Sequence, residues 1–176
     1  MKYYVEPLGC AKNQVDAETI IAHLNAAGAE FTENPDDAGL IIVNSCGFIE
    51  DAKRESINTV IGFRRIYPDK KIILSGCLAR RYQKELELEL VEADAVFGDG
   101  SLDAIAPFAF SLMNSRQPAV DPAETVPERV NLLSLPGSAY VKIAEGCDNH
   151  CSFCAIPLIR GGLNSRSIED ITGECK

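Results

Sequence analysis

The feature that most restricts the fold is an alternation of short apolar runs with helix-length segments. Residues 40–44 form an apolar run ending in one polar residue, which is typical of a strand buried on both faces of a parallel sheet. The predicted strands are residues 3–5, 40–44, 71–74 and 95–97, and the predicted helices are about residues 13–27, 49–66, 79–92 and 101–113. This order predicts an α/β fold, an open and mostly parallel sheet with helices on both faces.

The first predicted helix, residues 13–27, carries clear end signals. Asn13 is a residue type that caps helix N-termini, and Gly28 is the type that ends helices. The apolar side chains between them recur at helical spacing and are expected to face the sheet. His23 stands alone in this segment, without a second candidate ligand beside it, so we expect it at the surface.

A cysteine follows each of the first three predicted strands, close to the start of the next helix. These residues are Cys10, Cys46 and Cys77. Because the carboxyl ends of parallel strands meet at one edge of a sheet, where ligands bind, the three thiols are expected to lie together. Helix N-termini nearby favour thiolates and the negative charge of a thiolate-bound cluster. Each cysteine taken singly would more often be a small core residue, but the threefold repetition favours a cluster site.

A second group of cysteines lies within one loop. Cys147, Cys151 and Cys154 are separated by three residues and then by two. Residues 139–144 are predicted to form the strand that leads into this loop. Thiolates this close in sequence can converge on a single iron–sulfur cluster or metal ion. Three thiolates would leave one iron of a four-iron cluster open to a ligand that does not come from the protein.

A zinc site is the alternative for this loop, with His150 or Cys175 as the fourth ligand. Zinc sites usually consist of two separated pairs of cysteine or histidine residues. The sequence has no second pair of this kind, so its spacing favours the cluster.

Composition limits the classes of protein to which the chain can belong. Seven cysteines are an odd number, which argues against a secreted disulfide framework and for reduced thiols in the cytoplasm. The sequence contains no apolar run of transmembrane length and no signal-peptide core, so we expect a cytoplasmic protein without a membrane partner. A net charge of −9 disfavours binding to nucleic acid and suits a basic protein partner.

The regular pattern fades after residue 113. Residues 114–137 carry several prolines in polar sequence, as expected of a linker. The predicted organisation is therefore a first domain at residues 1–113, a linker at 114–137 and the start of a second domain at 138–176.

With both cysteine groups placed, essentially the whole chain resembles the radical S-adenosylmethionine methylthiotransferases. The resemblance is carried by Gly9-Cys10-Ala11-Lys12-Asn13, Asn44-Ser45-Cys46-Gly47-Phe48-Ile49, Ser75-Gly76-Cys77 and the Cys147–Cys154 loop with Ala155-Ile156-Pro157. The stretches 12–16 and 47–52 are similar to the RimO-type branch, which modifies an aspartate of a small-subunit ribosomal protein. The MiaB-type branch, which acts on tRNA adenosine, usually has Gln-Met-Asn after its first cysteine.

This resemblance implies a fold, cofactors and an activity. Residues 138–176 would begin a radical S-adenosylmethionine (β/α) barrel, and the chain would be an amino-terminal fragment, because a full barrel needs roughly 200 residues. One 4Fe-4S cluster, which binds S-adenosyl-L-methionine, would be held by Cys147, Cys151 and Cys154. An auxiliary 4Fe-4S cluster would be held by Cys10, Cys46 and Cys77. The activity would be insertion of a methylthio group at the aspartate β-carbon, with an electron donor such as flavodoxin as a further partner.

The chain departs from the family pattern in two ways. Asn164 stands where arginine is common, and most of the barrel and the carboxyl-terminal substrate-binding domain are absent, so we expect this chain alone to lack activity. Three alternatives stay open from the sequence: a tRNA adenosine methylthiotransferase of the MiaB type, a non-catalytic iron–sulfur or zinc-binding module, and a flavodoxin-like domain that binds a small ligand and has cysteines in its core.

Overall fold

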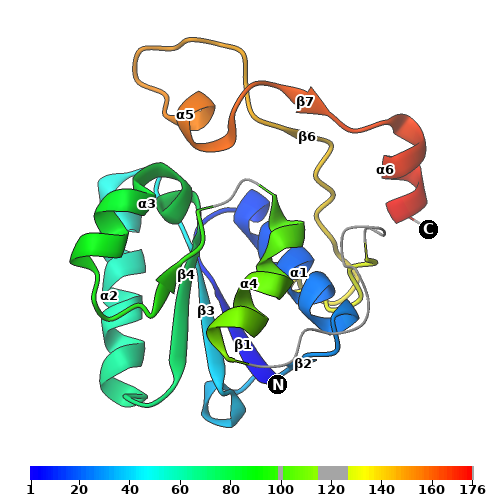
Figure 1. Ribbon diagram of the computed structural model, residues 1–176. Coiled ribbons are helices and arrows are strands. Elements are labelled where there is room, and N and C mark those ends of the chain that lie inside the picture. Colours follow the sequence, from blue (N-terminus) through cyan, green and yellow to red (C-terminus); the bar gives the residue numbers. More distant parts are fainter. Residues whose placement is uncertain (99–100, 115–126, 176) are drawn as a thin grey trace.

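The computed structural model of the chain describes residues 1–98, 101–114 and 127–175. Its main body is a five-stranded sheet in the order β2-β1-β3-β4-β5, in which each neighbouring pair of strands is parallel (Figure 1). The strands are β1 (Lys2–Pro7), β2 (Glu30–Phe31), β3 (Leu40–Ser45), β4 (Lys71–Gly76) and β5 (Ala95–Val96). The predicted α/β sheet is confirmed. The two-residue edge strand β2 was not predicted, because a strand this short carries no periodicity.

Helices cover both faces of the sheet, as predicted. On one face lie α1 and α4, and on the other lie α2 and α3 (Figure 1). The bounds are α1 (Ala11–Ala26), η1 (Pro35–Asp37), α2 (Glu50–Ile66), α3 (Cys77–Glu89), η2 (Leu102–Ala104) and α4 (Ile105–Leu112), where η marks a 3-10 helix.

The central strand β3 shows why its apolar run is continuous. Leu40 and Ile42 pack with α1 and α4, whereas Ile41 and Val43 pack with α2 and α3, and all four side chains are fully buried. A strand that is covered on both faces needs an apolar side chain at every position. Burial of each such side chain contributes about 1.5–3 kcal/mol, so β3 is held firmly between its neighbours β1 and β4.

Two helices begin earlier than the sequence predicts. In α1 the N-cap position is held by Cys10 rather than by Asn13. Asn13 is instead fully buried, and its amide donates hydrogen bonds to the backbone carbonyls of Leu8 (2.9 Å) and Ser45 (2.8 Å). In α3 the first helical residue is Cys77 itself, since β4 leads straight into the helix. Both cysteines therefore lie nearer to helix N-termini than the sequence indicated.

His23 is buried in α1, so the prediction that it lies at the surface was wrong. The residue is 5% exposed. Within the part of the chain that the structure describes, its Nδ1 atom has no hydrogen-bond partner. The helix α1 is covered by η2 and α4 as well as by the sheet, and a sequence window cannot reveal this second contact. Burial lowers the pKa of His23 below its usual value, although the negative charge of Asp103 opposes the shift.

This burial predicts that stability depends on pH. In the unfolded chain His23 takes up a proton at the ordinary pKa near 6.5, whereas in the folded protein it resists protonation. The unfolded state then binds more protons, so the free energy of unfolding is expected to fall as the pH drops below about 6.5. Urea unfolding at pH 7.5 and 5.5 measures this slope. His23→Gln should flatten this slope, whereas the control His150→Gln, at an exposed position, should leave it unchanged. An unchanged slope in His23→Gln would contradict the prediction.

Residues 127–175 form a smaller second part, which contains β6 (Ala144–Glu145), α5 (Ile156–Arg160), β7 (Asn164–Ser165) and α6 (Ile168–Glu174). The strands β6 and β7 pair antiparallel. The predicted strand at residues 139–144 is wrong in its extent, because the described chain provides only the short β7 as a partner and pairing stops after two residues. The start of a barrel and the domain boundaries stay predictions. Within the described ranges, no helix is both long and apolar enough to cross a membrane.

Candidate functional site

Three adjacent strands of the sheet each lead to a cysteine. Cys10 follows β1, Cys46 follows β3 and Cys77 follows β4. The strand order reverses at β1, because β2 lies on one side of it and β3, the next strand in the chain, lies on the other. In open parallel sheets the carboxyl ends of strands at such a reversal form a crevice in which ligands bind. The structure thus places the three predicted residues along the same edge of the sheet.

Glycines allow the three cysteine loops to approach one another closely. Gly9 has a φ of +93°, and a Cβ atom there would lie 2.8 Å from Cβ and 3.0 Å from Sγ of Cys46. Gly76 has a φ of +89°, and its Cβ would lie 2.5 Å from the carbonyl oxygen of Ser45. A Cβ on Gly47 would lie 2.7 Å from the backbone of α3. A side chain fits at none of these three positions without a clash, so the backbone at each glycine lies directly against a neighbouring loop, strand or helix start.

The three thiols at this edge differ in their surroundings. Cys46 and Cys77 are buried, whereas Cys10 is exposed. The Cys77 Sγ lies 3.1 Å from Asn13 Oδ1 and 3.2 Å from Arg160 Nη2. Burial raises the pKa of the Cys77 thiol above its usual value, and the charge and hydrogen bond of Arg160 act against that shift.

The described residues do not form a closed metal site. Across residues 1–98, 101–114 and 127–175, no three histidine, cysteine, aspartate or glutamate side chains converge closely enough to hold a metal ion. The role of the six cysteines as ligands therefore stays a prediction.

The loop that contains Cys147, Cys151 and Cys154 is closed at its base. The pairing of β6 with β7 joins its two ends, and the backbone N–H of Cys147 donates to the carbonyl of Gly161 (3.1 Å). Gly146 has a φ of +70°, and a Cβ there would lie 2.6 Å from that same carbonyl oxygen. Cys151 is exposed and the other two cysteines are half-buried. All three thus belong to one short closed loop.

The two cysteine groups meet at α5, which packs beside α3 (Figure 1). Ala155 and Ile159 form a small buried cluster with Cys77. Ala155 directly follows Cys154, so the loop that carries one cysteine group continues into a helix that packs with a member of the other. This juxtaposition could not be read from the sequence, because it depends on how the second part of the chain folds back over the sheet.

Buried acidic residues of α1 hold the second part of the chain in place. Asp16 accepts hydrogen bonds from Lys142 Nζ (2.6 Å) and Arg160 Nη2 (2.9 Å), and Glu18 pairs with Arg129. These contacts were not predicted from the sequence. A signal did exist, because Asp16 lies four residues before Ile20 and Glu18 lies three before Ile21, and residues at these spacings share a helix face. Carboxylates on a buried face need cationic partners.

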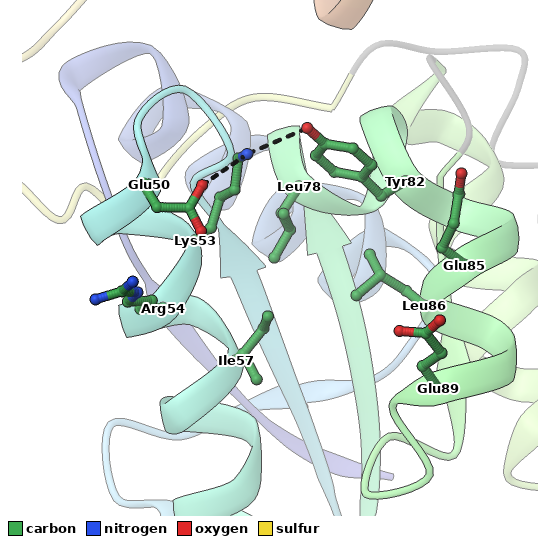
Figure 2. A pocket seen from close by; sticks show the side chains of 9 residues that line it. All are labelled: Glu50, Lys53, Arg54, Ile57, Leu78, Tyr82, Glu85, Leu86 and Glu89. Carbon is green, nitrogen blue, oxygen red and sulfur yellow. Dashed lines mark hydrogen bonds and ion pairs between the residues drawn. The ribbon is translucent and has the colours of Figure 1, made fainter.

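A separate hollow lies between α2 and α3 (Figure 2). Ile57, Leu78 and Leu86 give it an apolar lining, and charged side chains surround them. Lys53 Nζ donates to the hydroxyl of Tyr82 (3.1 Å) and so links the two helices across the hollow (Figure 2). The residues that line it include no cysteine, so this hollow is distinct from the cysteine edge.

Several curated relatives match the chain along nearly all its length. They include proteins named "Ribosomal protein uS12 methylthiotransferase RimO" from Treponema denticola and Aquifex aeolicus, each 48% identical, and from Clostridioides difficile, 42% identical. The alignments cover 96%, 100% and 100% of this chain. They cover 38%, 38% and 41% of the relatives, so the chain spans about two-fifths of their length.

A family model described as "Uncharacterized protein family UPF0004" matches residues 2–98. That stretch is more than half of the chain, and it contains the whole five-stranded sheet with Cys10, Cys46 and Cys77. The chain therefore belongs to the Uncharacterized protein family UPF0004, and its relatives include RimO-type methylthiotransferases.

Proposed function

We propose that this chain is the cluster-binding, amino-terminal portion of a RimO-type radical S-adenosylmethionine methylthiotransferase. The observation that carries the proposal is the meeting of the two cysteine groups at α5, with Ala155 and Ile159 packed against Cys77. The proposed organisation is a cluster domain at residues 1–113, a linker at 114–137 and the start of the radical domain at 138–176. We expect the activity to require the remainder of the protein.

The residues at the sheet edge suit an iron–sulfur cluster. Three thiols lie at the ends of adjacent strands, and the glycine contacts bring their loops together. Cys10 holds the N-cap of α1 and Cys77 begins α3, so both thiols lie at the positive ends of helix dipoles, which favour thiolates. Cys10, Cys46 and Cys77 would hold the auxiliary 4Fe-4S cluster.

The closed loop suits the second cluster. It holds three cysteines in one segment, and Cys151 is open to solvent. Cys147, Cys151 and Cys154 would hold a 4Fe-4S cluster with one iron free for S-adenosyl-L-methionine. When bound, these groups would supply the radical that abstracts hydrogen and the sulfur that is transferred, with the electron coming from an external donor. The chain itself orients them, since Ala155 and Ile159 hold the loop against the end of β4 and α3.

The proposed substrate is an aspartate β-carbon of a small-subunit ribosomal protein. Two observations support it: the relatives are named for ribosomal protein uS12, and the net charge of −9 suits a basic protein partner. An electron donor such as flavodoxin is a further proposed partner. A tRNA adenosine substrate would instead require a basic surface. Methylthio transfer by a full-length relative to purified uS12, but not to tRNA, is the outcome expected from this proposal.

Iron analysis tests the cluster proposal directly. After anaerobic reconstitution, the chain is expected to hold about eight irons and eight sulfides, because two four-iron clusters bind. Cys147→Ala and Cys77→Ala should each reduce this content to about four irons, since each removes one ligand set. Cys175→Ala, at an exposed cysteine outside both groups, is the matched control and should keep about eight. Bound zinc, or a chain without iron, would rule the proposal out in favour of a binding module.

A further inference from the structure

Arg160 lies at the contact between the two cysteine groups. It is the last residue of α5, and its side chain is 2% exposed. One nitrogen, Nη2, lies 2.8 Å from Asn13 Oδ1, 2.9 Å from Asp16 Oδ2 and 3.2 Å from Cys77 Sγ. The other nitrogen, Nη1, donates to Glu145 at 2.5 Å. The guanidinium thus joins α1, β6 and the start of α3.

Two carboxylates balance the positive charge of this guanidinium, so a thiolate at Cys77 is not needed to neutralise it. Asp16 and Glu145 both pair with it, and Asp16 is itself 4% exposed. Burial alone would raise the pKa of Glu145, but hydrogen bonds from Arg160 and Lys142 outweigh this effect and hold the pKa below its usual value. The hydrogen bond to Cys77 is therefore an additional contact rather than the one that neutralises Arg160.

The position of Asn13 decides which group can donate a hydrogen bond to the deprotonated sulfur of Cys77. Its amide nitrogen is committed to the carbonyls of Leu8 and Ser45, so its oxygen faces Cys77 Sγ at 3.1 Å. That oxygen accepts a hydrogen bond from a thiol but offers nothing to a thiolate. Among the contacts described for this sulfur, the donor that persists after deprotonation is Arg160 Nη2.

We propose that Arg160 is a positioning residue that links the two cysteine groups and stabilises the reduced state of the cluster held by Cys77. The inference rests on the proposed function. A hydrogen-bond donor on a ligand sulfur stabilises the negative charge that an added electron brings to the cluster and so raises the reduction potential. The redox step is a one-electron reduction by an external donor, in which no bond to the protein forms or breaks.

The test isolates one cluster in the full chain. A background variant with Cys147→Ala, Cys151→Ala and Cys154→Ala leaves Cys10, Cys46 and Cys77 as the ligand set. After anaerobic reconstitution, spectroelectrochemical titration gives the midpoint potential with Arg160, with Arg160→Lys and with Arg160→Gln. At the parent midpoint, Arg160→Gln is expected to raise the ratio of oxidised to reduced cluster about tenfold, which is about 59 mV for one electron.

Arg160→Lys is expected to fall between the parent and Arg160→Gln, because lysine keeps the charge but cannot reach all four acceptors at once. If Arg160→Gln fails to hold iron, the midpoint potentials of Arg160→Lys and the parent are compared instead. A lower potential in Arg160→Lys supports the role of Arg160, and an equal potential overturns it. Arg129→Gln is the matched control. Arg129 also pairs a buried carboxylate of α1, that of Glu18, but the described structure shows no contact between it and a cysteine.

The outcomes separate the inference from the function on which it rests. An iron-loaded Arg160→Gln variant with the parent potential overturns the role of Arg160 and leaves the cluster intact. An equal shift in Arg129→Gln also overturns it, since docking of the two parts would then explain the effect. A background variant that binds no iron overturns the proposed auxiliary cluster, and the inference falls with it.

Discussion

Replacing Gly76 with alanine is expected to destabilise the protein by at least about 3 kcal/mol. Gly76 ends β4 with a φ of +89°, where an L-residue other than glycine is strained. A Cβ atom there would also lie 2.5 Å from the carbonyl oxygen of Ser45 and 2.6 Å from Oδ1 of Asn44. Both partners belong to the buried strand β3, so neither can move away without disturbing the centre of the sheet.

A control variant separates the cost of the strained backbone from the cost of the close contact made by the added Cβ atom. Gly28 has a similar φ of +81°, but an added Cβ there would have no atom within 4 Å. Gly28→Ala is therefore expected to cost only the backbone strain, about 1–2 kcal/mol. Urea unfolding of both variants, followed by circular dichroism, measures the difference. Equal losses in the two variants would contradict the close contact between the loops that carry Cys46 and Cys77.

Replacing Asp16 with asparagine is expected to release the second part of the chain from α1. The carboxylate is nearly buried and pairs with Lys142 at 2.6 Å and Arg160 at 2.9 Å. Asparagine keeps the shape but loses the charge, so Lys142 and Arg160 are left to share the carboxylate of Glu145. Removing one member of a buried ion pair typically costs about 3–5 kcal/mol.

The expected result for Asp16→Asn is local rather than global. Amide hydrogen exchange should speed up in the segment from β6 to β7, while the central strands β3 and β4, whose core contacts lie away from this pair, keep their protection. Glu30→Gln is the matched control, because the Lys2–Glu30 pair is exposed and such pairs contribute at most about 1 kcal/mol. Unchanged exchange between residues 144 and 165 would show that Asp16 does not secure this segment.

Much of the five-stranded sheet and its helices could be predicted from the sequence because the signals are local. The apolar run of β3 indicated a buried parallel strand, and burial on both faces confirms it. The recurrence of a cysteine after each strand placed Cys10, Cys46 and Cys77 at one edge, since parallel strands share an orientation. The errors also have local causes. A two-residue strand such as β2 has no period, and Asn13 matched a capping pattern although its side chain is used between loops.

The sequence by itself determined the α/β architecture, the edge at which the first three cysteines lie and the grouping of the other three in one loop. Only the tertiary structure decided that His23 is buried, that Asp16 receives cations from the second part of the chain, and that Arg160 reaches Cys77. The physical reason is that periodicity records which face of a helix or strand is apolar. The partner of a buried charge is set by how distant segments pack, and no short window of sequence contains both members of the pair.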